Sequence, residues 1–307
     1  MSLRKLRSRR QSGENRQSCR VLIAGCGYVG QATADLFFEN DWKVEGWTRS
    51  PESAQKLCGK AYSVQAVDIS DKIQVAGSKR EYDAVVHCAS TRGGDVDLYR
   101  QVYLNGARHL LDRFVGSKIV FTSSTSVYGQ SDGAWITEES ATDPARETGR
   151  VLLEAEKLVL SRGGTVARLA GIYGPGRSAL LAKFLAGEVI VHPGNDRFIN
   201  QVHRDDVAAA LFLLSNRASG SAVERQIYNV VDDQPILQSE CYHWLAQKLN
   251  RPPLAIERST LKGKRGDSNK RVSNAKLRSL GWVPKYGNFA EAMEKSILPS
   301  FGQMSHE

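Results

Sequence analysis

Val21 to Gly30, with the sequence VLIAGCGYVG, is the stretch of this 307-residue chain that decides its fold. The apolar run Val21 to Ala24 predicts a buried β-strand, and the amphipathic run Tyr28 to Phe38 predicts a helix directly after it. A strand joined to a helix by so short a glycine-rich turn is typical of a parallel sheet built from βαβ units.

Three glycines in this turn form a GxGxxG motif. The first makes the tight turn, the second lets a pyrophosphate approach the backbone, and the third allows close packing of helix and strand. Free N–H groups and the helix dipole favour an anion at that helix N-terminus. The motif therefore predicts a dinucleotide site, with contacts from Gly25, Gly27, Tyr28, Val29 and Gly30.

Strands and helices alternate through the first half of the chain. Further strands are predicted at residues 43–47, 61–65, 84–87, 118–122 and 165–168, with helices from Ser50 and at 96–114 and 149–160. A helix at 206–214, a strand at 226–230 and two or three C-terminal helices follow. This pattern predicts an α/β fold, a Rossmann-type doubly wound parallel sheet with a smaller C-terminal substrate lobe.

The same pattern divides the chain into three parts. We expect a disordered basic tail at residues 1–19 and an NAD(P)-binding Rossmann domain at 20–170. Residues 171–300 are expected to form mainly the substrate lobe, with segments near 200–230 returning to the sheet.

The end of the second predicted strand bears on the choice of cofactor. An acidic side chain there binds the ribose 2′-hydroxyl of NAD, whereas an arginine pairs with the 2′-phosphate of NADP. This sequence has Arg49 and Ser50 and no carboxylate, which favours NADP(H) over NAD(H) by roughly 1.5–3 kcal/mol. The alternative is that Arg49 is a solvated surface residue. Asp68, next to Ile69 after the third strand, is placed to accept from the adenine amino group.

The spacing of the cysteines and histidines bears on the cellular compartment and on whether the protein binds a metal. Five scattered cysteines without a CxxC pair indicate reducing conditions, so we expect a cytoplasmic protein. Without an HExxH motif or a Cys/His cluster, we predict no metal. Apolar runs fall far short of the ~20 residues of a membrane-spanning helix.

Most of the formal charge of +9 lies at the N-terminus. Met1 to Arg20 holds six arginines, one lysine and one glutamate, which leaves +3 for the rest. A solubilising arm is the simplest interpretation, with organellar targeting or weak nucleic-acid binding as the alternatives. A second basic run is either a solvated loop or part of a pocket for an anionic small-molecule substrate. It comprises Lys262, Lys264, Arg265, Lys270 and Arg271.

Five further motifs follow the glycine turn in order. They are His87-Cys88-Ala89-Ser90, Asn105-Gly106, the SSxxVYG stretch Ser123 to Gly129, the R-x-x-x-x-YGPG stretch Arg168 to Gly176, and Phe198 to Val207. Together they resemble the extended short-chain dehydrogenase/reductase superfamily from Val21 to about Ala292. The chain is most similar to atypical members known as NAD-dependent epimerase/dehydratase family proteins. The resemblance implies a homodimer, a catalytic Ser124, and cofactor contacts from Cys88, Ala89, Ser90 and Asn105.

The YxxxK pair of that superfamily has no counterpart here. With Glu156 as the register mark, the tyrosine and lysine fall on Thr148 and Leu152. An acid/base of this kind typically contributes about 10²–10⁴ in rate, or roughly 3–5 kcal/mol of barrier. Threonine cannot replace it, because its hydroxyl does not ionise near neutral pH.

Two tyrosines are the nearest substitutes as proton donor. A packing role is favoured for Tyr128, whereas Tyr173 lies in a loop expected to face the nicotinamide and is our candidate beside Ser124. Arg150 is a further candidate for the missing cation.

Two functions fit these observations. The first is an NAD(P)(H)-dependent oxidoreductase or epimerase/dehydratase-like enzyme acting on a small polar, anionic carbonyl or hydroxyl compound. The alternative is a non-catalytic regulator or scaffold that binds NADP(H).

Overall fold

Seven parallel strands form the central sheet of the computed structural model, which describes residues 18–91, 93–191, 196–216, 223–252, 255–256 and 268–303. Lys262, Lys264, Arg265 and residues 1–17 of the predicted tail lie outside the described residues. In spatial order the strands are β12 (Ile227–Val230), β7 (Thr165–Leu169), β5 (Lys118–Ser124), β4 (Ala84–His87), β1 (Arg20–Ala24), β2 (Lys43–Thr48) and β3 (Ser63–Ala66).

The order of strands reverses at β1. Successive strands β2 and β3 extend to one side of it, and β4, β5, β7 and β12 extend to the other. Such a switch point leaves a crevice outside the carboxyl ends of the strands, where sheets of this type bind ligands. The prediction of a Rossmann-type doubly wound α/β fold is therefore confirmed.

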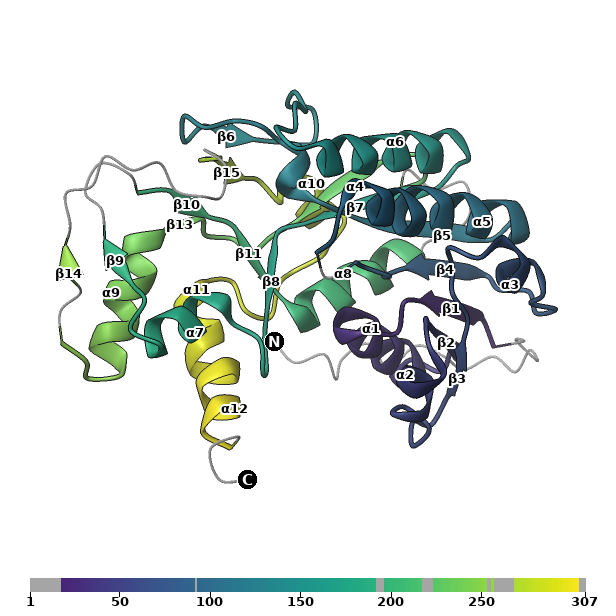
Figure 1. The fold of residues 1–307 in the computed structure, drawn as a ribbon, viewed down its shortest axis with the longest axis horizontal. Coiled ribbons are helices and arrows are strands. Elements are labelled where there is room, and N and C mark those ends of the chain that lie inside the picture. The colour runs from purple at the N-terminus through teal and green to yellow at the C-terminus, as the bar shows by residue number, and fades with distance from the viewer. Residues whose placement is uncertain are drawn as a thin grey trace.

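Helices cover both faces of the sheet (Figure 1). One face carries α1 (Tyr28–Glu39) and α8 (Arg204–Ser215), which pack against each other. The opposite face carries α4 (Val96–Tyr99), η2 (Arg100–Asn105), α5 (Gly106–Arg113) and α6 (Glu147–Ser161). The predicted helix at 96–114 is thus continuous but contains a π-helical turn. Two short helices, α2 (Pro51–Gln55) and α3 (Lys72–Ala76), lie near β3 and α5 respectively.

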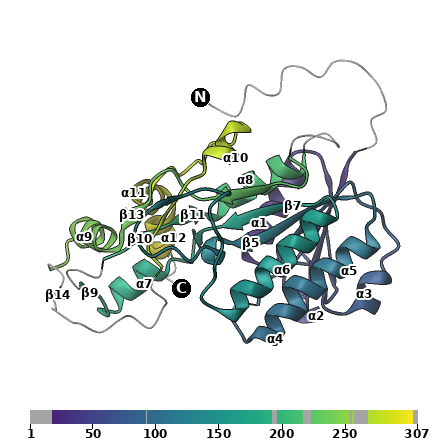
Figure 2. The same ribbon diagram turned by 90° about the horizontal axis from the view of Figure 1, so that it is seen from above.

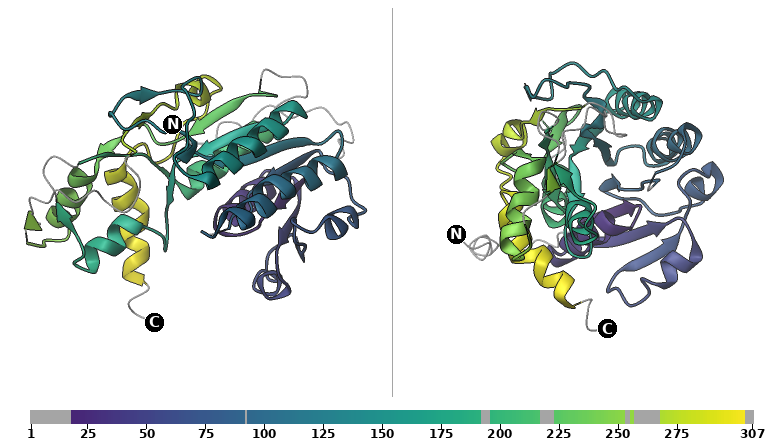
Figure 3. Two further views of the ribbon diagram at one scale, coloured as in Figure 1. Left: turned by 45° about the horizontal axis from the view of Figure 1, so that its top comes forward. Right: turned by 60° about the vertical axis from the view of Figure 1, so that its left-hand side comes forward.

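The C-terminal lobe lies beside the sheet (Figures 2 and 3) and has a hydrophobic core of its own. Leu181, Leu245, Phe289 and Met293 are among its fully buried members. Its helices are α7 (Ala179–Leu185), α9 (Gln238–Lys248), α11 (Phe289–Ala292), η4 (Met293–Ile297) and α12 (Leu298–Gln303), with α10 (Ala275–Ser279) packed near β12. Helix α8 and strand β12 lie between α7 and α9 in the sequence, but they pack with the central sheet.

Among the described residues, four pairs of very short strands lie outside the central sheet. They are β6 (Trp135–Ile136) with β15 (Arg271–Val272), β8 (Gly171–Tyr173) with β11 (Gln201–His203), β10 (Phe198–Ile199) with β13 (Ile236–Leu237), and β9 (Ile190–Val191) with β14 (Ala255–Ile256). The turn η3 (Thr125–Val127) follows β5. Within the described part of the chain, no helix has the length and apolar character needed to cross a membrane.

Candidate functional site

In the glycine turn between β1 and α1, neighbouring backbone encloses the first and third glycines, whereas the second faces open space. Gly25 has a φ of +103°, and a Cβ there would lie 2.2 Å from the amide nitrogen of Ala89. A Cβ on Gly30 would lie 2.2 Å from the carbonyl oxygen of Gly25. A Cβ on Gly27, in contrast, would meet nothing within 4 Å. Packing therefore requires the first and third glycines, whereas the second borders open space.

That open space lies at the N-terminus of α1, which begins at Tyr28 and has no side-chain cap. The amides of Gly25 and Cys26 both donate to the carbonyl of Trp47, at 3.0 and 2.7 Å, which fixes the turn against β2. An uncapped helix start beside an open glycine suits a pyrophosphate, since its N–H groups and dipole favour an anion. Tyr28 and Val29 are half-buried at this start.

The end of β2 presents a cation to the same edge of the sheet. Arg49 is exposed, and among the described residues it has no hydrogen bond or ion pair. The Ser50 hydroxyl accepts from the Ser53 amide at 3.3 Å and caps α2, with Pro51 in its first turn, as the sequence predicts. The Ser50 hydroxyl also donates to Ser53 Oγ at 3.2 Å, so Ser50 has a local structural role at the start of α2.

Two more predicted cofactor residues follow β3. Asp68 Oδ1 accepts from the backbone and hydroxyl of Ser70, at 2.9 and 2.7 Å. Ile69 is buried, and its Cδ1 lies 2.8 Å from where a Cβ on Gly106 would be, so the neighbouring Asn105 is close to this loop. Asn105 itself is half-buried and accepts from Arg108.

The segment after β4 lies against the glycine turn. The Cys88 amide donates to the Ala24 carbonyl at 2.8 Å, and Ala89 is the backbone that Gly25 must accommodate. Ser90 is exposed at the end of this segment. The structure therefore brings Cys88 and Ala89 next to the glycine motif, although about sixty residues separate them in sequence.

Ser124 is half-buried at the carboxyl end of β5. Its oxygen accepts from the Ser126 amide at 3.1 Å. Because that bond uses a lone pair, the hydroxyl proton remains available to donate to another oxygen.

Thr148 and Leu152, on which the sequence register places the superfamily's tyrosine and lysine, lie on α6. Thr148 is half-buried, and Leu152 is only 3% exposed within the main core. Arg150 is exposed and forms an ion pair with Glu147 on the same helix. Arg150 is thus already paired with a carboxylate.

The two candidate tyrosines are both buried. Tyr128 donates its hydroxyl to Asn229 Oδ1 at 2.9 Å, while the Tyr173 hydroxyl has no hydrogen-bond partner among the described residues. Tyr173 is 1% exposed in the core of the C-terminal lobe, its ring against His203. Burial, with a smaller effect of Asp232, raises its pKa well above the usual range. The structure shows no contact between Tyr173 and Ser124.

Two features that contact the stretch Ser123 to Gly129 were not predicted from the sequence. A buried ion pair joins Glu156 to Arg168, and the same carboxylate accepts from Ser123 at 2.5 Å. Lys270 is also buried, with its amine against the Tyr128 carbonyl. The register of Glu156 within its helix could have suggested the first feature. Nothing in the basic run distinguishes Lys270 from its neighbours.

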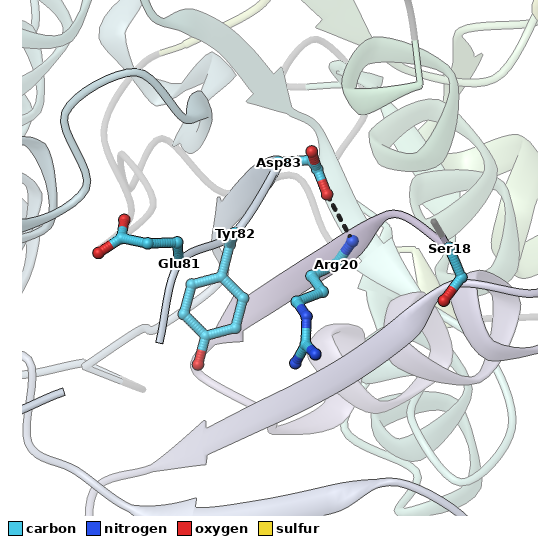
Figure 4. A pocket seen from close by; sticks show the side chains of 5 residues that line it. All are labelled: Ser18, Arg20, Glu81, Tyr82 and Asp83. Atoms are coloured by element: carbon cyan, nitrogen blue, oxygen red, sulfur yellow. Dashed lines mark hydrogen bonds between the residues drawn. The ribbon is translucent and has the colours of Figure 1, made fainter. Parts of the chain in front are cut away.

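A hollow of about 270 Å³ lies at the end of the sheet opposite the glycine turn (Figure 4). It is lined by Ser18, Arg20, Glu81, Tyr82 and Asp83, and the Asp83 carboxylate accepts from the Arg20 amide at 2.7 Å. These residues precede or begin β1 and β4. The hollow is therefore at the amino ends of the strands, away from the glycine turn.

Comparison with known proteins agrees with this geometry. The model of the NAD dependent epimerase/dehydratase family matches residues 21–230. Protein YeeZ of Escherichia coli (strain K12) is 30% identical over 259 residues, which cover 80% of this chain and 89% of YeeZ.

Solved structures show the same fold. A Methylobacillus flagellatus protein assigned to the NAD-dependent epimerases/dehydratases has 26% identity and a TM-score of 0.74, covering 94% of this chain and all of its own. UDP-glucose 4-epimerase of Thermus thermophilus, solved in complex with NAD, has a TM-score of 0.74 at 21% identity, covering 89% of this chain and 96% of its own. The matches confirm the resemblance inferred from the motifs.

Proposed function

Because the chain belongs to the NAD-dependent epimerase/dehydratase family, we propose that it is an NADP(H)-using enzyme acting on a small, polar, anionic carbonyl or hydroxyl compound. Membership of the family supports an oxidoreductase-like or epimerase-like role with a nicotinamide dinucleotide. The choice of NADP(H), the substrate class and the residue roles are our proposals.

The glycine turn is the observation that carries the proposal. Gly27 borders open space at an uncapped helix start, while Gly25 and Gly30 are enclosed by backbone. The residues present therefore fit a pyrophosphate. Arg49 would hold a 2′-phosphate, since it is exposed and no described carboxylate pairs with it.

Ser124 is the proposed catalytic residue. A bound nicotinamide supplies hydride transfer at its C4 atom. Ser124 would donate its free hydroxyl proton in a hydrogen bond to the substrate oxygen and so hold the reacting carbon in place. Tyr173 remains a candidate proton donor only if substrate binding opens its buried hydroxyl to the site, because a tyrosine with a raised pKa is a weak acid.

The non-catalytic regulator is supported by a different observation. Leu152 is packed in the core where the superfamily has its lysine, and the Tyr128 hydroxyl is bonded to Asn229. Neither position offers a proton donor to Ser124. A protein that binds NADPH tightly but oxidises none with a panel of aldehydes, ketones and oxo acids would favour the regulator.

Calorimetric titration with NADPH and NADH tests the cofactor assignment. Arg49→Ala should weaken NADPH binding by about tenfold or more and leave NADH binding unchanged, because only NADPH has the 2′-phosphate. Arg251→Ala, which removes another exposed arginine from the C-terminal lobe, is the matched control. Equal affinity for NADPH in wild type and Arg49→Ala would reject the role of Arg49.

A further inference from the structure

Lys270 is a buried cation without a counter-ion. Its residue is 6% exposed, and its Nζ donates to the Tyr128 carbonyl and to Ser268 Oγ, each at 2.6 Å. Among the described residues, no carboxylate forms an ion pair with it. Arg168, the other buried cation, is in contrast bonded to Glu156.

The backbone around Lys270 is fixed from both sides. The Asn200 side chain donates to the Lys270 carbonyl at 2.8 Å and accepts from the Val272 amide at 2.7 Å. The Asn269 amide donates to the Gln130 carbonyl at 3.1 Å. The amine is therefore held at one position, against the carbonyl of Tyr128 at the end of η3, by segments that are distant in sequence.

Such a position is costly for a charged amine. A buried cation is normally neutralised by a nearby carboxylate, because two neutral acceptors replace only part of its hydration. Burial lowers the pKa of Lys270 to about 8, and no charged neighbour contributes to the shift. The amine is still mostly protonated at neutral pH, and two of its three N–H groups are used by the bonds to Tyr128 and Ser268.

We propose that Lys270 binds the anionic group of the substrate, a carboxylate or phosphate, while Ser124 holds its reacting oxygen. The assignment rests on the proposed function. It follows from the bond between an ammonium without a described counter-ion and the carbonyl of Tyr128, which ends the turn η3 that Ser124 begins. The favoured substrates are therefore oxo or hydroxy acids and phosphates.

Calorimetric titration of the NADPH-loaded full chain with malonate and with inorganic phosphate tests this assignment. Lys270→Met should weaken the binding of these anions by about tenfold or more, since it removes their charge partner. Lys276→Met is the matched control, because Lys276 is a half-buried lysine that donates to Gln226 instead. It should change the affinity by less than about twofold.

A second measurement needs no variant. Malonate keeps its charge from pH 7 to pH 9, whereas an amine with a pKa of about 8 loses its proton. Wild-type affinity for malonate should therefore fall by about tenfold over this range.

The outcomes are distinguishable. Wild-type protein that binds NADPH but binds neither anion overturns the Lys270 assignment alone. Anion affinity that is the same in Lys270→Met, or that does not change up to pH 9, also overturns it. Wild-type protein that fails to bind NADPH overturns the function on which the assignment rests.

Discussion

Arg168 and Glu156 form a doubly bonded ion pair inside the protein, with Nη2 to Oε2 at 2.6 Å and Nε to Oε1 at 3.0 Å. The carboxylate also accepts from Ser123, the residue before Ser124, and the guanidinium lies over the Tyr128 ring at 4.8 Å. One buried charge pair thus fixes the position of the turn that presents Ser124. A buried ion pair of this kind fixes the positions of its residues more reliably than it adds to the net free energy of unfolding.

Removing one partner of this pair should destabilise the fold strongly. Glu156→Ala leaves the Arg168 charge buried without a counter-ion, so we expect a loss of about 3–5 kcal/mol in the free energy of unfolding. Glu154→Ala, which removes the exposed partner of Arg100, should cost less than about 1 kcal/mol. Urea unfolding of both variants measures the difference. Equal losses would contradict the structural role of the buried pair.

The three glycines of the turn should respond differently to the same substitution. Gly27→Ala should fold normally but bind NADPH about tenfold more weakly, because its Cβ enters the space proposed for the pyrophosphate. Gly30→Ala should destabilise the protein by about 1–3 kcal/mol, because its Cβ collides with the Gly25 carbonyl. Calorimetry and urea unfolding of the two variants separate these effects. A Gly27→Ala protein with wild-type affinity would place the cofactor elsewhere.

The two candidate tyrosines, Tyr128 and Tyr173, form another matched pair. Tyr128→Phe loses the hydrogen bond to Asn229 and should cost about 1 kcal/mol or more. Tyr173→Phe removes a buried hydroxyl with no described partner, so it should leave stability unchanged or raise it slightly. Denaturant unfolding tests the ranking. A larger loss for Tyr173→Phe would mean that its hydroxyl is hydrogen-bonded in solution.

The buried amine of Lys270 should make stability depend on alkaline pH. Burial lowers its folded-state pKa from 10.5 to about 8, so between these values the unfolded chain binds more protons. Stability should then rise with pH across this window, by about 3 kcal/mol at most. Lys270→Met should lack that rise. Urea midpoints measured from pH 7.5 to 10.5 give the comparison, and identical slopes for the two proteins would refute the burial of a charged amine.

The inner strands of the sheet were predictable because they are buried on both sides and several read as continuous apolar runs, whereas the edge strand β3 is mostly exposed. In β1, for example, Val21 to Ala24 are all fully buried. The two-residue strands outside the central sheet, such as β6 and β15, have no periodicity to detect. The π-helical turn Arg100–Asn105 could not be predicted either, because it shifts the helical periodicity of the side chains by only one residue.

The candidate site was only partly predictable. The GxGxxG spacing locates the turn, since each glycine is required by a local contact or approach. The burial of Lys270 is not encoded locally, because it depends on Asn200 and on the carbonyl of Tyr128, both far away in sequence. The same holds for Tyr173, which the motif placed near the nicotinamide, whereas the structure packs its ring in the core of the C-terminal lobe.

A crystal structure of the chain with NADPH tests the central claim most directly. The account predicts the pyrophosphate within hydrogen-bond distance of the backbone amides at the start of α1, above Gly27, and the 2′-phosphate beside Arg49. A dinucleotide bound away from the Gly25–Gly30 turn, or a 2′-phosphate that does not contact Arg49, would contradict it.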